Sequence, residues 1–436
     1  MDASSRSAHS NALRAPLLAA LVAFVAGVGW LVLSHQLELL ESLGVPTMQP
    51  RFADARAISG ASVTLAQGLD PLITNPGDPL GRPMNYPRAW LVLAWLGLAP
   101  EHTPWLALAF LAAFFAGLCA LVPLATTRAG AWCLALGALS PAVWLGVERA
   151  NNDLPMFGLV ALAALAVARS PWFASGLIAA AATLKLFPIF AVAGLAGAGP
   201  RRATRLGLGL ALAFVVYVIA TWGDLATIRA NTAHWDRIAY GVTQLPHLLA
   251  SENGWPASTL LAIGAALLAA VAAGSLWLRT QVRLGGTPAQ LAAFRCGAAI
   301  HVGTFCTGSH FDYRLSFLLL AVPQIAAWLA TTRGATRAGF GVTLAAILAS
   351  MWGMTWMQWL RAGSGESVAM LGDEAIGWIL VALLIVAGTL TLPDAMLPRR
   401  WRNARWLAAP VEPAVVHELP AAPGDVRPRK RHVTTA

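Results

Sequence analysis

The stretch PWLALAFLAAFFAGLCALVPLAT, residues 104–126, contains no charged residue and is long enough to cross a bilayer as one helix. Of the 436 residues, 57% are hydrophobic and 11% are charged, whereas soluble domains carry roughly a quarter of their residues as charged types. The sequence therefore predicts an all-α, polytopic integral membrane protein. Nine further apolar runs lie on either side of the first: 15–35, 129–147, 154–168, 206–222, 256–279, 289–305, 314–331, 338–360 and 374–392.

Two more apolar regions decide how often the chain crosses the membrane. In one alternative, residues 89–100 cross and residues 171–197 form one helix. In the other, 89–100 lies on the surface, and 171–197 breaks at Pro188 into two short helices that meet at Lys185 on the outer side. Both give about twelve transmembrane helices, within a range of about ten to thirteen. We favour the second, because it places more Arg on the cytoplasmic side and keeps Lys185 out of the bilayer centre.

Positive charge orients the predicted spans. Three basic loops, at 199–205, 279–286 and 331–337, fall on one side, which the positive-inside rule makes cytoplasmic. The first run lacks a cleavage site, so we expect it to be an anchor. The expected organisation is a cytoplasmic amino terminus (1–14), a membrane domain (15–394) with long external loops at 36–88 and 223–255, and a basic, Pro-rich, disordered cytoplasmic tail (395–436).

The net charge of +10 could suggest a nucleic-acid partner, but the tail alone holds eight basic residues. We expect attraction to membrane lipid and no nucleic acid. The four cysteines have no CxxC spacing and the predicted external carboxylates are scattered, so no disulfide, metal site or cofactor is expected, although a divalent metal stays open. The absence of GxGxxG followed by an acidic residue, Walker, HExxH and GxSxG motifs weakens ATP-driven transport and serine hydrolysis.

Asp54 is the first candidate for chemistry. It stands between Arg51 and Arg56 in QPRFADAR, residues 49–56. Nearby positive charge stabilises the ionised form of a carboxylate, which suits Asp54 to accept a proton from a substrate hydroxyl. The alternative is a solvated helical turn whose charges form weak surface ion pairs.

Lys185 is the second candidate, because the chain has 28 Arg but only two Lys. An ammonium beside a helix break at the membrane boundary is a plausible contact for a phosphate. The alternative is that the side chain extends to the interface to keep its charge in water.

Further candidates lie in two segments that the favoured topology brings to the outer face. TGSHFDYRLSFLLLAVP, residues 307–323, contains His310 and Arg314, which could instead belong to an interfacial anchor. VERANNDLP, residues 147–155, contributes further candidates. Their alternative role is structural, because Asp or Asn at an N-cap followed by a proline favours the start of a helix. The remaining candidates for donor-phosphate or substrate binding are Arg149, Asn152 and Asp153 in this segment and Tyr86 in the first external loop.

Several segments, in this order, resemble a known family: ADARAISGASVTLAQGLDPL (53–72), MNYPRAWLVLAWLGLAP (84–100) and ASGLIAAAATLKLFPIFAVAGLAGAGPRR (174–202). They resemble bacterial GT-C superfamily membrane glycosyltransferases of family eighty-seven, the DUF2029-like, polyprenyl-phosphate-mannose-dependent mannosyltransferases. VERANNDLP and LKLFP are also similar to the RGNxD and KxYP segments of the mannosyltransferase that starts the GPI-anchor glycan. The resemblance covers roughly residues 15–330.

The resemblance implies a GT-C-like fold and an inverting hexosyltransferase that uses a polyprenyl-phosphate sugar, with mannose as the expected hexose. The acceptor would be a lipid or glycan hydroxyl at the outer face of the bacterial cytoplasmic membrane. Asp54 matches the family's catalytic aspartate, Lys185 matches its lysine, and His310 and Arg314 fall where polar residues lie near the donor phosphate. The chain departs from the pattern at Arg88, where the family usually has a second proline.

A transporter or flippase for a lipid-linked or small polar substrate is the alternative function. Its polar residues would line a cavity. The sequence shows no internal repeat, and its first loop is longer than such repeats tend to have. These two features favour the enzyme.

Overall fold

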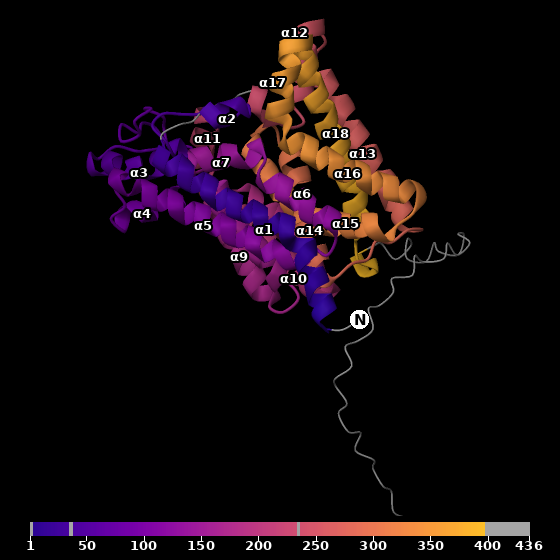
Figure 1. Ribbon diagram of the computed structural model, residues 1–436. Coiled ribbons are helices and arrows are strands. Elements are labelled where there is room, and N and C mark those ends of the chain that lie inside the picture. The colour runs from indigo at the N-terminus through magenta and orange to yellow at the C-terminus, as the bar shows by residue number, and fades with distance from the viewer. Residues whose placement is uncertain (1–2, 35–37, 233–235, 397–436) are drawn as a thin grey trace, which may run out of the picture.

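The computed structural model describes residues 3–34, 38–232 and 236–396, and these residues form a helical protein with one very small sheet (Figure 1). The α-helices are α1 (Ala3–Ser34), α2 (Glu38–Ser42), α3 (Ala53–Ala66), α4 (Val92–Trp95), α5 (Thr103–Leu121), α6 (Arg128–Ala138), α7 (Pro141–Arg149), α8 (Asp153–Ala166), α9 (Pro171–Leu184), α10 (Pro200–Ala220), α11 (Trp222–Asn231), α12 (Gln244–Asn253), α13 (Ala257–Arg279), α14 (Pro288–Cys306), α15 (Val322–Thr331), α16 (Gly334–Met351), α17 (Gly353–Ser364) and α18 (Glu366–Leu390).

Shorter elements connect these helices. The 3₁₀ helices are η1 (Arg88–Leu91), η2 (Pro100–His102), η3 (Val122–Leu124), η4 (Phe187–Ala198), η5 (Asp236–Ile238), η6 (Asp312–Leu320) and η7 (Asp394–Met396). Strands β1 (Ala239–Tyr240) and β2 (His310–Phe311) pair antiparallel, with Tyr240 opposite His310. This pairing joins the segment that follows α11 to the segment that precedes η6.

The all-α, polytopic architecture predicted from the apolar runs is confirmed. Among the described residues, five helices are long and apolar enough to cross a membrane, and two bent helix pairs raise that number to seven. One bent pair is α6 with α7, and the other is η6 with α15. Four shorter apolar helices, Ala15–Trp30, Asp153–Ala166, Pro171–Leu184 and Phe187–Ala198, account for further predicted runs. The predicted number of about twelve exceeds seven because it counted such short and broken runs as crossings.

The two ambiguous regions take the form expected in the favoured alternative. Residues 89–100 contain the end of η1, the four-residue helix α4 and the first residue of η2, and Trp95 and Leu96 are exposed, so they do not build a spanning helix. Helix α9 ends at Leu184, Lys185 has an extended backbone, and η4 begins at Phe187. The break therefore falls at Lys185.

The predicted loops and tail differ in how much of them the structure describes. The segment 36–88 contains α2 and α3, and the segment 223–255 contains most of α11 and all of α12, so both include helices. Arg88, the departure from the family pattern, forms exposed ion pairs with Asp70 at 2.7 Å and Asp224 at 2.8 Å. Of the predicted tail, only Ala395 and Met396 belong to the described residues.

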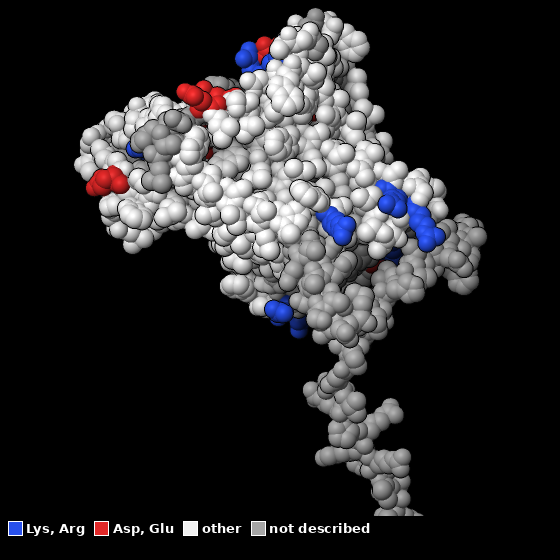
Figure 2. Space-filling view, in the orientation of Figure 1, with Lys and Arg blue, Asp and Glu red and all other residues white. Residues whose placement is uncertain are grey.

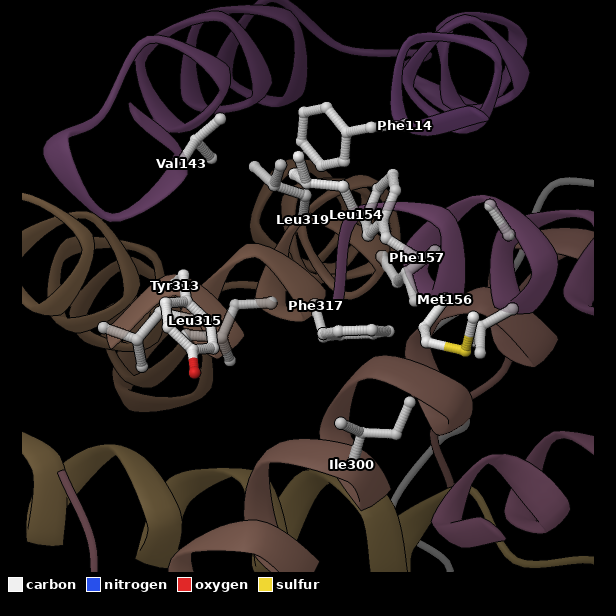
Figure 3. Close-up of a cluster of buried hydrophobic side chains, with 14 of the residues drawn as sticks. Phe114, Val143, Leu154, Met156, Phe157, Ile300, Tyr313, Leu315, Phe317 and Leu319 are labelled. Carbon is white, nitrogen blue, oxygen red and sulfur yellow. The ribbon is translucent and has the colours of Figure 1, made fainter. Parts of the chain in front are cut away.

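Aromatic side chains hold together the core beneath the polar candidates. Phe157 on α8 lies between Phe114 on α5, with ring centroids 4.7 Å apart, and Phe317 on η6, 5.8 Å away (Figure 3). Phe317 also meets Phe187 of η4 at 5.2 Å. These contacts connect four elements, α5, α8, η4 and η6, that are separate in the sequence. They fix the relative positions of the helix ends that carry the polar candidates.

We predict that Gly158→Ala destabilises the protein, because α5 and α8 approach closely at this glycine. A methyl group there would lie 2.4 Å from the backbone oxygen of Ala113, and overpacking of this kind costs about 1–3 kcal/mol. Gly176→Ala in α9 is the matched control, since nothing within 4 Å would meet its methyl group. Thermal unfolding in detergent should show a lower midpoint for Gly158→Ala only. Equal midpoints for the two variants would contradict the close packing.

Candidate functional site

Asp54 lies in the first turn of α3 and is only 8% exposed. Its Oδ2 accepts a hydrogen bond from Asn151 Nδ2 at 2.6 Å, and its Oδ1 lies 3.3 Å from Arg82 Nη1. The alternative of a solvated helical turn is therefore wrong. A buried carboxylate with two donors has a fixed position and direction, which a proton acceptor requires.

Arg82 is the residue that sequence reasoning missed. The flanking arginines were expected to hold Asp54, but Arg56 Nε donates to the backbone oxygen of Arg51 at 2.7 Å. Arg82 instead binds Asp54, the side chain of Asp78 at 2.8 Å and the backbone oxygen of Ala53 at 2.5 Å. The available signal was that Arg82 is the only cation between Arg56 and Arg88.

The turn between α7 and α8 presents three consecutive polar side chains to the site. Helix α7 ends at Arg149, and the left-handed backbone of its C-cap Ala150 (φ 45°) reverses the chain. Asn151 Oδ1 then accepts from the backbone nitrogen of Asp153 at 2.8 Å. Asn152, the N-cap of α8, makes no side-chain cap hydrogen bond with any described residue. The helix-start alternative therefore holds for Asn151, whose side chain bonds the first N–H of α8, whereas the side chains of Asn152 and Asp153 face Lys185.

Lys185 is buried at the break between α9 and η4, with 7% of the residue exposed. Its Nζ donates to Asn151 Oδ1 at 3.2 Å and to Asn152 Oδ1, and it lies 2.5 Å from Asp153 Oδ1. The ammonium also lies over the ring of Tyr86, 4.9 Å from its centroid. The alternative in which Lys185 extends to the interface is therefore wrong.

Asp153 joins Lys185 to the third cation of the site. Its second oxygen, Oδ2, lies 3.1 Å from Arg314 Nε, so one carboxylate contacts two cations. Arg314 Nη1 also pairs with Nδ1 of His310, and its guanidinium stacks on Phe187 at 4.6 Å. Burial of the carboxylate side chain, which is 2% exposed, strengthens both contacts by excluding water.

Protonation states follow from burial for the groups outside the spans. Burial lowers the pKa of His310, and the charge of Arg314 lowers it further. The imidazole is therefore neutral, which lets Nδ1 accept from Arg314 while Nε2 faces the Thr307 hydroxyl at 3.1 Å. Burial and then the charge of Asp54 raise the pKa of Tyr86 well above its ordinary value, so its hydroxyl keeps its proton.

Arg149 lies beside the network without a close ionic partner in it. Its Nε is 3.9 Å from Glu148 Oε2, and its guanidinium lies 5.6 Å from the centroid of the Phe311 ring. Glu148 accepts from the backbone nitrogen of Met48 at 2.8 Å, which ties the segment before Asp54 to the end of α7. Arg149 is 7% exposed and belongs to the wall of the site.

Two other carboxylates, Asp70 and Asp312, do not join the network. The hydrogen bond from Arg88 lowers the pKa of Asp70, which lies on the loop surface. Asp312 is adjacent to site residues in sequence but lines a separate small cavity with His301, Asp373 and Glu374. Among the described residues, no group of three His, Cys, Asp or Glu side chains converges in a way that could hold a metal ion.

Comparison with known proteins adds a distant likeness. No family model matches the chain, and no curated protein matches it. Among solved structures, the chain is similar to the crystal structure of ArnT from Cupriavidus metallidurans in the apo state, with 17% identity and a TM-score of 0.34. The match covers 84% of this chain and 78% of that chain. At this identity and TM-score, the likeness carries no argument about function, which rests on the site itself.

Proposed function

We propose that this protein is a membrane glycosyltransferase that transfers a hexose from a polyprenyl-phosphate sugar to a hydroxyl of a lipid or glycan acceptor. One observation carries the proposal: a buried polar network runs without interruption from Asp54 through Asn151 to Lys185, and from there through Asp153 to Arg314. It places a carboxylate suited to proton transfer beside a group of cations suited to a phosphate.

In the proposed reaction, Asp54 accepts the proton of the acceptor hydroxyl. The acceptor oxygen forms a bond to the anomeric carbon as the bond from that carbon to the phosphate oxygen breaks, with inversion of configuration. Asn151 and Arg82 hold the two carboxylate oxygens of Asp54, which directs the base toward the acceptor. General base catalysis of this kind contributes roughly 10²–10⁴-fold to a rate.

The leaving group is a lipid phosphate, which is already a stable anion. The protein therefore needs positive charge near the phosphate more than it needs a general acid. Lys185 and Arg314 supply that charge in the proposal, with neutral His310 orienting the guanidinium of Arg314. Tyr86 contributes a hydroxyl donor and the face of its ring beside Lys185. Arg149 and Asn152 complete the proposed binding surface for substrate.

The distribution of surface charge supports an outward-facing site in the cytoplasmic membrane. Figure 2 shows blue side chains mainly toward the lower and right parts of the molecule, red ones mainly toward the upper left, and one blue and one red group side by side at the top. The first turns of α10 carry exposed Arg201, Arg202 and Arg205, and Figure 1 shows α10 in the lower part of the molecule and α2 in the upper part. Positive charge gathers on the cytoplasmic side of membrane proteins. Asp54 on α3 would then face outward.

The choice of sugar and donor lipid rests on the sequence resemblance. The three segments that resemble the family, at 53–72, 84–100 and 174–202 in the same order along the chain, support a polyprenyl-phosphate donor and mannose as the hexose. Purified protein in lipid nanodiscs, incubated with labelled polyprenyl-phosphate mannose and a membrane lipid extract, should yield a new labelled glycolipid detectable by mass spectrometry. Movement of the donor across liposomes, with no product formed, would favour the transporter or flippase instead.

A further inference from the structure

Lys185 and Arg314, the two cations assigned to the donor phosphate, already share an anion. Asp153 places one oxygen 2.5 Å from Lys185 Nζ and the other 3.1 Å from Arg314 Nε. The carboxylate occupies the position between two cations that a phosphate would be expected to take. The three groups together carry a net charge of one positive unit, rather than the two of the cations alone.

Lys185 has further partners besides Asp153. An ammonium has three donors, and three oxygens surround Lys185 Nζ: it donates hydrogen bonds to Asn151 Oδ1 and Asn152 Oδ1 and forms an ion pair with Asp153 Oδ1. A phosphate oxygen that binds Lys185 directly must therefore replace one of them. Asp153 is the charged member of the three, so its competition with the phosphate has the largest energetic effect.

We propose that Asp153 is an internal counter-anion that competes with the phosphate of the substrate for Lys185 and Arg314, and so sets which charge state of phosphate the site retains. This inference rests on the proposed function. The donor is a phosphodiester with one negative charge, which matches the net charge of the three groups. The product is a phosphomonoester, which carries close to two negative charges at neutral pH.

The competition matters for release of the product. Two buried cations without a counter-anion would attract the dianionic product more strongly than the monoanionic donor, because the attraction scales with the product of the charges. Asp153 offsets one positive charge and therefore lowers this preference. Its role is to determine selectivity and turnover, and it need not contact the reacting atoms.

The test measures binding alone, with no acceptor and no transfer. Wild type and Asp153→Asn in nanodiscs are titrated calorimetrically with decyl phosphate, a monoester, and with decyl methyl phosphate, a diester. We expect Asp153→Asn to bind the monoester at least about tenfold more tightly than wild type does, with a smaller change for the diester. An unchanged monoester-to-diester ratio, weaker monoester binding, or no saturable binding to either protein would overturn the proposal.

Further variants distinguish an effect of charge on phosphate binding from a loss of folding. Asp153→Glu keeps the charge and should keep the wild-type ratio. Arg314→Gln removes one cation and should weaken monoester binding at least about tenfold. This variant tests the role of the cations even if Asp153→Asn does not fold. Asp312→Asn is the matched control, since this buried carboxylate lines a different cavity, and its ratio should equal that of wild type.

The outcome is independent of the transfer assay. Absence of sugar transfer by wild type, together with the expected binding ratios, would refute the glycosyltransferase proposal and leave the counter-anion in place. If wild type transfers sugar but Asp153→Asn has the same monoester-to-diester binding ratio as wild type, the counter-anion proposal is refuted and the glycosyltransferase proposal stands.

Discussion

Replacing Asp54 by Asn should reduce sugar transfer about 10²–10⁴-fold, because the variant keeps the shape of the side chain but loses the base. An amide oxygen at position 54 can still accept a hydrogen bond from Asn151 or Arg82, so the fold of the first loop should persist. The measurement is the initial rate of labelled product formation in nanodiscs, with thermal unfolding as a check on folding. The affinity for the donor should change little.

Asp70→Asn is the matched control for this variant. Asp70 belongs to the same loop, but its ion pair with Arg88 is exposed and outside the buried network. Exposed pairs contribute about 0–1 kcal/mol, so transfer by Asp70→Asn should stay within about twofold of wild type. An Asp54→Asn protein that keeps more than about a tenth of wild-type activity would remove Asp54 from the role of base.

Replacing Asp153 by Leu should destabilise the protein by about 3–5 kcal/mol, more than Lys185→Met does. The reason is that one carboxylate, Asp153, contacts both cations. Loss of Asp153 leaves two buried cations, Lys185 and Arg314, without their common anion, whereas loss of Lys185 leaves a neutral Asp153–Arg314 pair. Chemical unfolding in mixed detergent micelles measures both. Adding Lys185→Met to Asp153→Leu should recover stability, with a coupling energy of about 0.5–3 kcal/mol.

The exposed pair between Arg237 and Glu366 supplies the control cycle. Its side chains are 61% and 43% exposed, so Arg237→Met, Glu366→Leu and the double variant should each stay within about 0.5 kcal/mol of wild type. If Lys185→Met proved as destabilising as Asp153→Leu, or if the double variant were the least stable of all, the shared-anion arrangement would be wrong.

Much of the architecture could be predicted from local patterns. Apolar runs of spanning length predicted the helices, and a proline after a lone lysine predicted the break that the structure places at Lys185. These features depend on residues within one helix or one turn, which sequence displays directly. The number of crossings was harder to predict, because short runs such as 89–100 have the composition of a span without its length.

The candidate site was predictable as a set of residues but not as a set of contacts. Lys185 stands out in the sequence as a single charge within an apolar run, and Asp54 and Arg314 stand out as charges in short polar segments. Their partners do not stand out. Proximity in sequence suggested Arg51 and Arg56 for Asp54, yet Asp54 binds Arg82. Asp312 is only two residues from Arg314 in sequence, yet it faces another cavity.

The sequence by itself determined that this chain is a helical membrane protein with a polar first loop, a helix break at Lys185 and charged residues at the ends of its apolar runs. Only the tertiary structure decided which of those charges meet. The contacts of Asp54 with Arg82 and with Asn151 join residues 28 and 97 positions apart, and that of Arg314 with Asp153 joins residues 161 positions apart. The physical reason is that a buried charge must find a partner wherever packing brings one within reach, and packing depends on the whole chain.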